Sequence, residues 1–152
     1  MSVEYTAVAE QVVTAGTNVL FTEDVIPCRK GYVDHRRGSG LIELRGVTNQ
    51  CRARYVVTFS GNIAPAAAAD GGVLGEVAVA LSINGEPVLS SLRRITAAAV
   101  EQYGAVSATE IIDVARGTTV TIAVKNVSEG TATTAASAID TQNFSIAIER
   151  LA

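Results

Sequence analysis

The stretch Glu76-Val-Ala-Val-Ala-Leu-Ser-Ile-Asn-Gly-Glu-Pro-Val88 decides the fold class of this chain. Its large apolar residues alternate with Ala78, Ala80 and Ser82, which is the two-residue period of a β-strand. The Asn-Gly pair that follows supplies the positive φ angles of a two-residue hairpin turn. A strand whose second face is small rather than charged is predicted to be covered on both sides, and we expect a second copy of the chain to provide the cover.

Other segments repeat this alternation between turn residues, which indicates an all-β chain. The clearest are residues 52–60, 119–126 and 144–149, and shorter apolar segments lie at 19–22, 24–28, 41–46 and 107–114. Residues 91–103 fit either one or two turns of helix or extended chain, and we favour extended chain because the rest is β. Several short strands separated by turns predict a β-sandwich of jelly-roll type.

The bulk composition describes one domain with little charge. The chain has 152 residues, which is an ordinary size for a single domain, and no repeat or linker divides it. We predict that residues 1–17 form an N-terminal arm or a first strand, and that residues 18–152 form the jelly roll. Charged residues make up only 18% of the chain, against a typical value of about 25%. This composition favours self-association over the alternative of a charge-poor monomeric sandwich.

The charge pattern argues against nucleic-acid binding and against a membrane protein. The net charge is -3, whereas a general nucleic-acid binder needs a basic surface to neutralise phosphates. The dense basic cluster His35-Arg36-Arg37 is predicted to be a polar loop that pairs between subunits, with His35 facing Glu23 or Asp24. The chain shows neither a secretory signal at its start nor an apolar run long enough to span a bilayer, so we expect synthesis in a cytoplasm.

Two cysteines, Cys28 and Cys51, lie at the edges of apparent strands. A disulfide between them would contribute roughly 3 kcal/mol in the chain-entropy model. Reduced thiols are the default after cytoplasmic synthesis, but a protein that matures outside the cell can still oxidise. Both states of this pair stay open at this point.

Catalytic and metal-binding patterns are largely missing from the sequence. His35 is the only histidine, and Gly38-Ser39-Gly40 is a flexible turn rather than the nucleophile elbow that a Ser-His-Asp triad would use. Asp70 and Asp140 lie in loops that could contact calcium, but no Asp-x-Asp-x-Asp-Gly loop is present. We therefore predict no enzymatic activity, no metal site and no cofactor.

Four stretches together resemble the trimeric jelly-roll heads of the tumour-necrosis-factor and complement globular-head superfamily. They are Gly46 to Phe59, Val77 to Glu86, Ile112 to Ile122, and Phe144 to Ile148. The resemblance implies a homotrimer whose three-fold axis is closed by strands with aromatic or small residues. The candidate interface residues are then Tyr55, Phe59, Ala78, Ala80 and Ser82. The chain departs from the family in having few aromatic residues and no collagen-like stalk.

The whole chain is also similar to short proteins encoded in prophages of Gram-positive bacteria. The stretches that carry this likeness are Asn18 to Glu23, His35 to Gly40, and Arg52 to Tyr55. It implies a structural protein of a bacteriophage virion, such as a trimeric capsid decoration or head-fibre protein bound to the major capsid protein or another virion protein. The alternative is a trimeric receptor-binding head that recognises a host-surface glycan or protein through loops 62–75 and 131–142.

Overall fold

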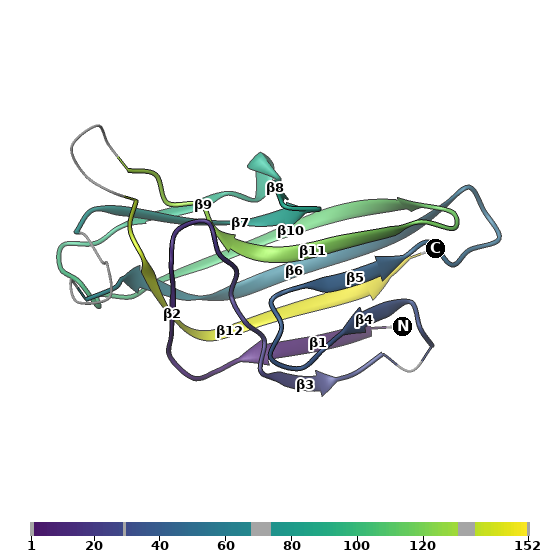
Figure 1. The fold of residues 1–152 in the computed structure, drawn as a ribbon, viewed down its shortest axis with the longest axis horizontal. Helices are drawn as coiled ribbons and strands as arrows, with labels where there is room; N and C mark the ends of the chain where they lie inside the picture. The colour runs from purple at the N-terminus through teal and green to yellow at the C-terminus, as the bar shows by residue number, and fades with distance from the viewer. Residues whose placement is uncertain (1, 29, 68–73, 131–135, 152) are drawn as a thin grey trace.

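Two antiparallel β-sheets lie face to face along the length of the molecule (Figure 1). The computed structural model describes residues 2–28, 30–67, 74–130 and 136–151. The first sheet has the strand order β10-β6-β12-β1-β3, with β2 beside β12, and the second has the order β4-β5-β11-β7-β8, with β9 beside β7. The all-β sandwich predicted from the strand pattern is confirmed.

The strands of each sheet come from distant parts of the chain, so the sheets are built by long-range pairing. The first sheet contains β1 (Ser2–Ala7), β2 (Gln11–Val13), β3 (Glu23–Ile26), β6 (Arg52–Pro65), β10 (Gly104–Ala115) and β12 (Ile139–Arg150). The second contains β4 (Val33–His35), β5 (Ile42–Arg45), β7 (Glu76–Ile83), β8 (Glu86–Pro87), β9 (Arg93–Thr96) and β11 (Thr119–Asn126). A short 3-10 helix, η2 (Leu89–Ser91), connects β8 to β9.

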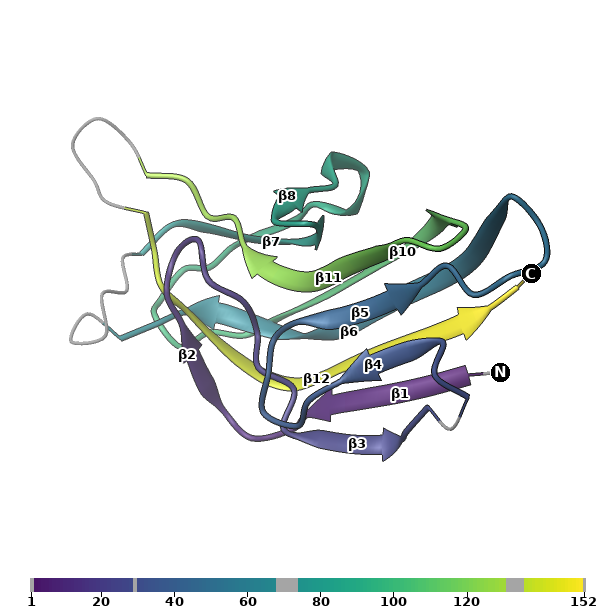
Figure 2. The same cartoon turned by 45° about the vertical axis from the view of Figure 1, so that its right-hand side comes forward.

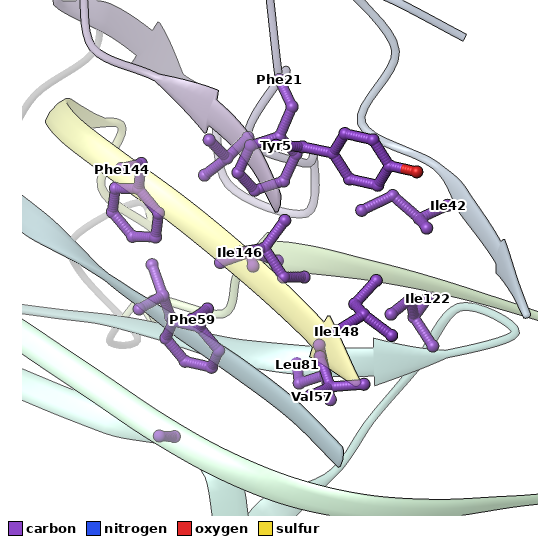
Figure 3. Close-up of a cluster of buried hydrophobic side chains, with 14 of the residues drawn as sticks. Tyr5, Phe21, Ile42, Val57, Phe59, Leu81, Ile122, Phe144, Ile146 and Ile148 are labelled. Atoms are coloured by element: carbon purple, nitrogen blue, oxygen red, sulfur yellow. The ribbon is translucent and has the colours of Figure 1, made fainter. Parts of the chain in front are cut away.

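The core lies between the two sheets and is made by the inward half of each alternating strand. In β6, Tyr55, Val57 and Phe59 are buried, while the residues between them are partly or fully exposed. Phe59 stacks on Phe144 of the neighbouring strand, with ring centroids 6.3 Å apart (Figure 3). Burying a side chain of this size stabilises the fold by about 1.5–3 kcal/mol, so the aromatic and branched residues of this layer hold the sheets together.

The hairpin predicted at the end of β7 is present. Ile83 pairs with Glu86, and the two turn residues have φ angles of 51° at Asn84 and 87° at Gly85. These are the left-handed conformations that a two-residue hairpin turn requires, and Asn and Gly adopt them most easily.

The second face of β7 is covered by the chain itself, which corrects the expectation that another copy covers it. Ala78, Ala80 and Ser82 are all buried within the single chain. Lys125 lies opposite Ala80 on the neighbouring strand, and its Nζ donates to the Gly85 carbonyl at 3.1 Å. Its aliphatic stem therefore extends from Ala80 toward the turn while its charge stays at the surface, and Ala78 lies opposite Arg94 of β9 instead.

Two segments whose structure the sequence left open are extended. Residues 2–7 and 11–13, within the predicted arm or first strand, form β1 and β2, and β1 pairs with β12 along its whole length. Residues 93–96 of the ambiguous segment form β9. Within the described ranges, the structure contains no helix that is long and apolar enough to cross a membrane.

Candidate subunit interface

The outer face of the first sheet, opposite the core, is lined at its centre by small and uncharged side chains. We call the centre of this face, on β10, β6 and β12, the open face. Its uncharged outward residues are partly or fully exposed: Val56, Thr58, Ser60, Ser107, Thr109, Ile111, Ser145 and Ala147; the exposed Glu149, opposite Val56, borders them. Ile111 alone exposes 64% of its surface. A sheet surface whose centre carries no charge is well suited to contact another protein surface.

Most hydroxyl groups in the middle of the open face already have partners. Thr58 Oγ1 and Thr109 Oγ1 lie 3.0 Å apart on paired strands, and Ser60 Oγ and Ser145 Oγ lie 3.3 Å apart. Because each hydroxyl satisfies its neighbour, covering the face leaves fewer polar groups without hydrogen bonds. The face can therefore be dehydrated at low cost.

A charged pair marks one end of the open face. Arg54 donates to Asp113 across the β6–β10 pair, from Nε at 2.8 Å and from Nη2 at 3.1 Å. This hydrogen bonding lowers the pKa of the Asp113 carboxyl and raises that of the Arg54 guanidinium. Both side chains keep substantial contact with water, so the pair borders the face rather than stabilising its centre.

A depression of about 380 Å³ lies at the other end of the open face. It is lined by Ser60, Gly61, Asn62, Ala105, Val106, Ser107 and Asn143. It lies beside a β-bulge in β12, where Asn143 has a φ of 54°. A Cβ at Gly61 would lie 2.3 Å from the Phe144 ring, so a glycine is needed where that ring packs under the strand.

The segment that follows β8 lies at the edge of the sandwich away from β3 (Figures 1 and 2). Leu89 of η2 exposes 78% of its surface. The turn beneath it is rigid, because the buried Ser91 hydroxyl accepts from Leu81 N at 2.9 Å and donates to Val88 O at 2.6 Å. Nearby, Arg93 Nε donates to Ser107 O at 2.8 Å and ties β9 to the edge of β10.

The interface residues expected from the sequence lie inside the single chain. Tyr55 and Phe59 are core residues, and the Tyr55 hydroxyl lies 2.6 Å from the Arg45 carbonyl to which it donates. Ala78, Ala80 and Ser82 are buried on the outer side of β7. These five side chains are at most 3% exposed, so they offer almost no surface to a partner. Sequence reasoning missed the open face, although its Ser and Thr residues were visible in the polar half of residues 52–60.

His35 was predicted to lie in a polar loop and to pair between subunits, and the structure corrects this. Its side chain is fully buried at the end of β4, and its Nδ1 lies 2.7 Å from Asp24 Oδ1 of the same chain. Its Nε2 lies 2.9 Å from the Ser39 carbonyl oxygen, and the ring lies against Tyr5 with centroids 4.4 Å apart. Asp24 is thus the predicted partner, but within the protomer. Arg36 and Arg37 follow on an exposed turn, where pairing with another subunit stays a prediction.

The surroundings of His35 also exclude a Ser-His-Asp triad built on this histidine. The imidazole contacts the backbone carbonyl of Ser39 rather than its hydroxyl, and that hydroxyl accepts from Leu41 N at 3.0 Å. Both ring nitrogens therefore face acceptors, and neither is directed at a nucleophile. A general base needs such a contact with the group it activates, so His35 serves structure at this position.

Cys28 and Cys51 are not joined by a disulfide in the structure. Cys28 is half-buried, and although burial favours the neutral thiol, hydrogen bonds from the backbone of residues 30–33 outweigh it and lower the thiol pKa. Cys51 is exposed in the loop before β6.

One group of carboxylates within the described ranges could hold a metal ion. Single oxygens of Glu10, Glu101 and Asp140 lie within 4.8 Å of one another, and Asp140 is buried. Burial and the nearby acids, Glu10 in particular, raise the pKa of Tyr103 to about 12. Oxygen ligands suit a hard cation such as Ca²⁺. Asp140 is one of the two loop acids that the sequence singled out, and Asp70, the other, lies outside the described residues.

The comparisons with known proteins identify the fold. No protein-family model and no curated protein matches the sequence. Among solved structures, the globular domain of zebrafish complement 1qA covers 99% of this chain with 95% of its own length, a TM-score of 0.61 and 11% identity. The match to Eiger TNF from S. frugiperda covers 100% of this chain and 92% of Eiger, with a TM-score of 0.65 and 11% identity.

A third solved structure, murine APRIL, covers 98% of the chain with 99% of its own length, a TM-score of 0.53 and 12% identity. These neighbours are complement and tumour-necrosis-factor domains, which are not enzymes. At such low identity the similarity establishes the fold and not the function. The chain is therefore an all-β, two-sheet jelly roll of the complement and tumour-necrosis-factor type.

Proposed function

We propose that this chain is a non-catalytic assembly and binding module that works as a homotrimer, with the open face as one side of the subunit interface. The observation that carries this proposal is the uncharged outer face of the first sheet, whose central hydroxyls already pair with one another. Folds of the complement and tumour-necrosis-factor type typically form homotrimers, which agrees with such a face. The charge-poor composition supports the same conclusion.

A cyclic trimer needs two different surfaces on each subunit, because the same contact is repeated around a three-fold axis. The open face provides the first. Leu89, presented on the rigid η2 turn at the sandwich edge, provides an apolar projection for the second. We place Leu89 of one subunit against the open face of the next, where the depression beside Gly61 offers space for it.

We further propose that the trimer is a structural component of a bacteriophage virion, as a capsid decoration or head-fibre protein bound to the major capsid protein. The basis is the resemblance of three stretches, Asn18 to Glu23, His35 to Gly40 and Arg52 to Tyr55, to prophage-encoded proteins. Symmetry agrees with it, because a closed trimer matches the three-fold positions of an icosahedral shell. A receptor-binding head on the same trimer is the second candidate. Parts of its proposed contact loops, residues 68–73 and 131–135, lie outside the described residues.

Analytical ultracentrifugation at micromolar concentration tests the assembly. The wild type is expected to sediment as a trimer of the 15.7 kDa chain. Thr109→Arg places a charge on the open face and is expected to give a folded monomer, whereas Thr119→Arg, on the outward side of β11 in the other sheet, is the matched control and leaves the trimer intact. A monomeric wild type would contradict the proposal.

The virion role needs a separate measurement. Cryo-electron microscopy of the particle that carries this protein is expected to show density for it at three-fold positions of the capsid. Density at the tail tip, together with binding of the purified trimer to host-surface glycans or proteins, would favour the receptor-binding alternative.

A further inference from the structure

A hollow of about 370 Å³ opens at the end of the sandwich where the two termini lie (Figure 1). It is formed between the loop that joins β5 to β6 and the end of β12. The lining residues, which we call the arginine hollow, are Tyr32, Val47, Thr48, Asn49, Gln50 and Arg150. None of them belongs to the open face, so the arginine hollow is independent of the proposed trimer contact.

The cation of this hollow is held in place by aromatic rings. The guanidinium carbon of Arg150 lies 4.3 Å from the centroid of the Tyr32 ring and 5.7 Å from that of Tyr55. Tyr55 is fully buried, and its hydroxyl is anchored by the Arg45 and Tyr32 carbonyls at 2.6 and 3.1 Å. Stacking on fixed rings restricts the long side chain before any ligand arrives, which reduces the entropy lost on binding.

The loop that forms the other wall is also fixed. Gly46 N donates to Thr118 O at 2.8 Å, Gly117 N donates to Gly46 O at 3.0 Å, and Arg116 N donates to Cys51 O at 3.0 Å. Within the loop, Gln50 N donates to the Thr48 hydroxyl at 3.1 Å. The hollow is therefore preformed, as ligand sites usually are, and its volume lies at the lower end of the typical range of about 300–1,000 Å³.

The chemistry of the lining points to one class of ligand. Arg150 is the only charged group among its described residues; its Nη1 is buried, and the positive charge of the guanidinium favours a carboxylate at the hollow. The hydroxyl of Thr48 and the amides of Asn49 and Gln50 are suited to sugar hydroxyls, and Val47, 52% exposed, offers an apolar contact. We propose that the arginine hollow binds an acidic sugar of monosaccharide size, with Arg150 on its carboxylate.

A titration of the ¹⁵N-labelled protein followed by NMR tests this proposal. Glucuronate is expected to shift the amide signals of residues 47–50, whereas glucose, which has no carboxylate, is expected to bind at least about tenfold more weakly. N-acetylalanine carries a carboxylate without sugar hydroxyls and is also expected to bind more weakly. Absence of shifts, equal binding of glucose, or equal binding of N-acetylalanine would each overturn the assignment of an acidic sugar.

Variants locate the binding and separate it from stability. Arg150→Gln is expected to weaken glucuronate binding about tenfold or more. Arg116→Gln removes the same charge from the neighbouring exposed turn and is expected to leave binding within about twofold, because Arg116 does not line the hollow. Arg150 packs on Tyr32, so replacing it can also disturb the fold. Asn49 and Gln50 are exposed, and Asn49→Ala and Gln50→Ala are expected to weaken binding while keeping the fold. Unchanged affinity in both, or equal losses in Arg116→Gln and Arg150→Gln, would contradict the site.

Discussion

The outer faces of the two sheets carry similar small residues but have opposite relations to solvent. On the second sheet, Ala78 and Ala80 are buried, and each lies opposite a long side chain, Arg94 of β9 for Ala78 and Lys125 of β11 for Ala80. On the first sheet, Thr109 and Ala147 remain exposed, and both lie opposite the short side chain of Thr58 on β6. Small residues on a strand therefore do not by themselves indicate an interface. The side chains on the adjacent strands decide whether the chain covers them or leaves them for a partner.

The largest effect is expected from placing the same charged side chain on each face. Ala80→Arg forces a guanidinium into a site with no free space and is expected to lower the free energy of unfolding by about 3 kcal/mol or more. Thr109→Arg, on the exposed face, is expected to change it by less than about 1 kcal/mol once the protein is monomeric. Urea unfolding followed by circular dichroism compares the two. Similar losses in both variants would mean that the faces do not differ in cover.

A glycine of the open face provides the next test. Gly61→Ala brings a methyl group to 2.3 Å from the Phe144 ring, which is wedged in the core, and is expected to destabilise the fold by about 1–3 kcal/mol. Gly104→Ala on the neighbouring strand meets only the Ile95 side chain, at 3.1 Å, and is expected to cost less because that side chain can move. Thermal unfolding measures both, and a larger loss in Gly104→Ala would contradict this account of the depression.

The projection that we place against the open face should affect assembly rather than folding. Leu89→Ser is expected to weaken trimer association by about 1–2 kcal/mol per contact, because an apolar anchor at an interface is lost. Its effect on the unfolding of the monomeric Thr109→Arg background should be small, since Leu89 is 78% exposed. Sedimentation equilibrium of Leu89→Ser against Leu20→Ser, another exposed leucine far from η2 in sequence, measures this difference. Equal association in the two variants would remove Leu89 from the interface.

The lysine that covers the second sheet is expected to have a smaller effect. Lys125→Ala removes the stem that lies along Ala80 and is expected to lower stability by about 0.5–1 kcal/mol, whereas Lys125→Met keeps an apolar chain of similar length and should lose less. Urea unfolding again gives the comparison. If Met were as damaging as Ala, the hydrogen bond to Gly85 and not the covering stem would be the relevant contact.

The sequence predicted what depends on neighbours along the chain and failed where distant strands meet. The alternation of residues 52–60 and the Asn-Gly turn after Ile83 are local signals, and both correspond to the observed strand and hairpin. The burial of His35 against Asp24 and Tyr5 joins three separate segments, and no local pattern encodes it. The same holds for Lys125 opposite Ala80, and the burial of the five candidate interface residues could not be read from their own strands.

The smallest effect concerns the charged border of the open face, and it depends on pH. Arg54 lowers the pKa of Asp113 in the folded state, so the pair stabilises the fold above the unfolded carboxyl pKa of about 3.9 and loses that contribution as pH falls through the folded value. Asp113→Asn is therefore expected to lower the melting temperature slightly at pH 7, and the difference from wild type should shrink toward pH 2. Because the pair is exposed, added salt should reduce the difference at pH 7 as well. A difference that persisted unchanged at low pH would show that Asp113 contributes through packing rather than through its charge.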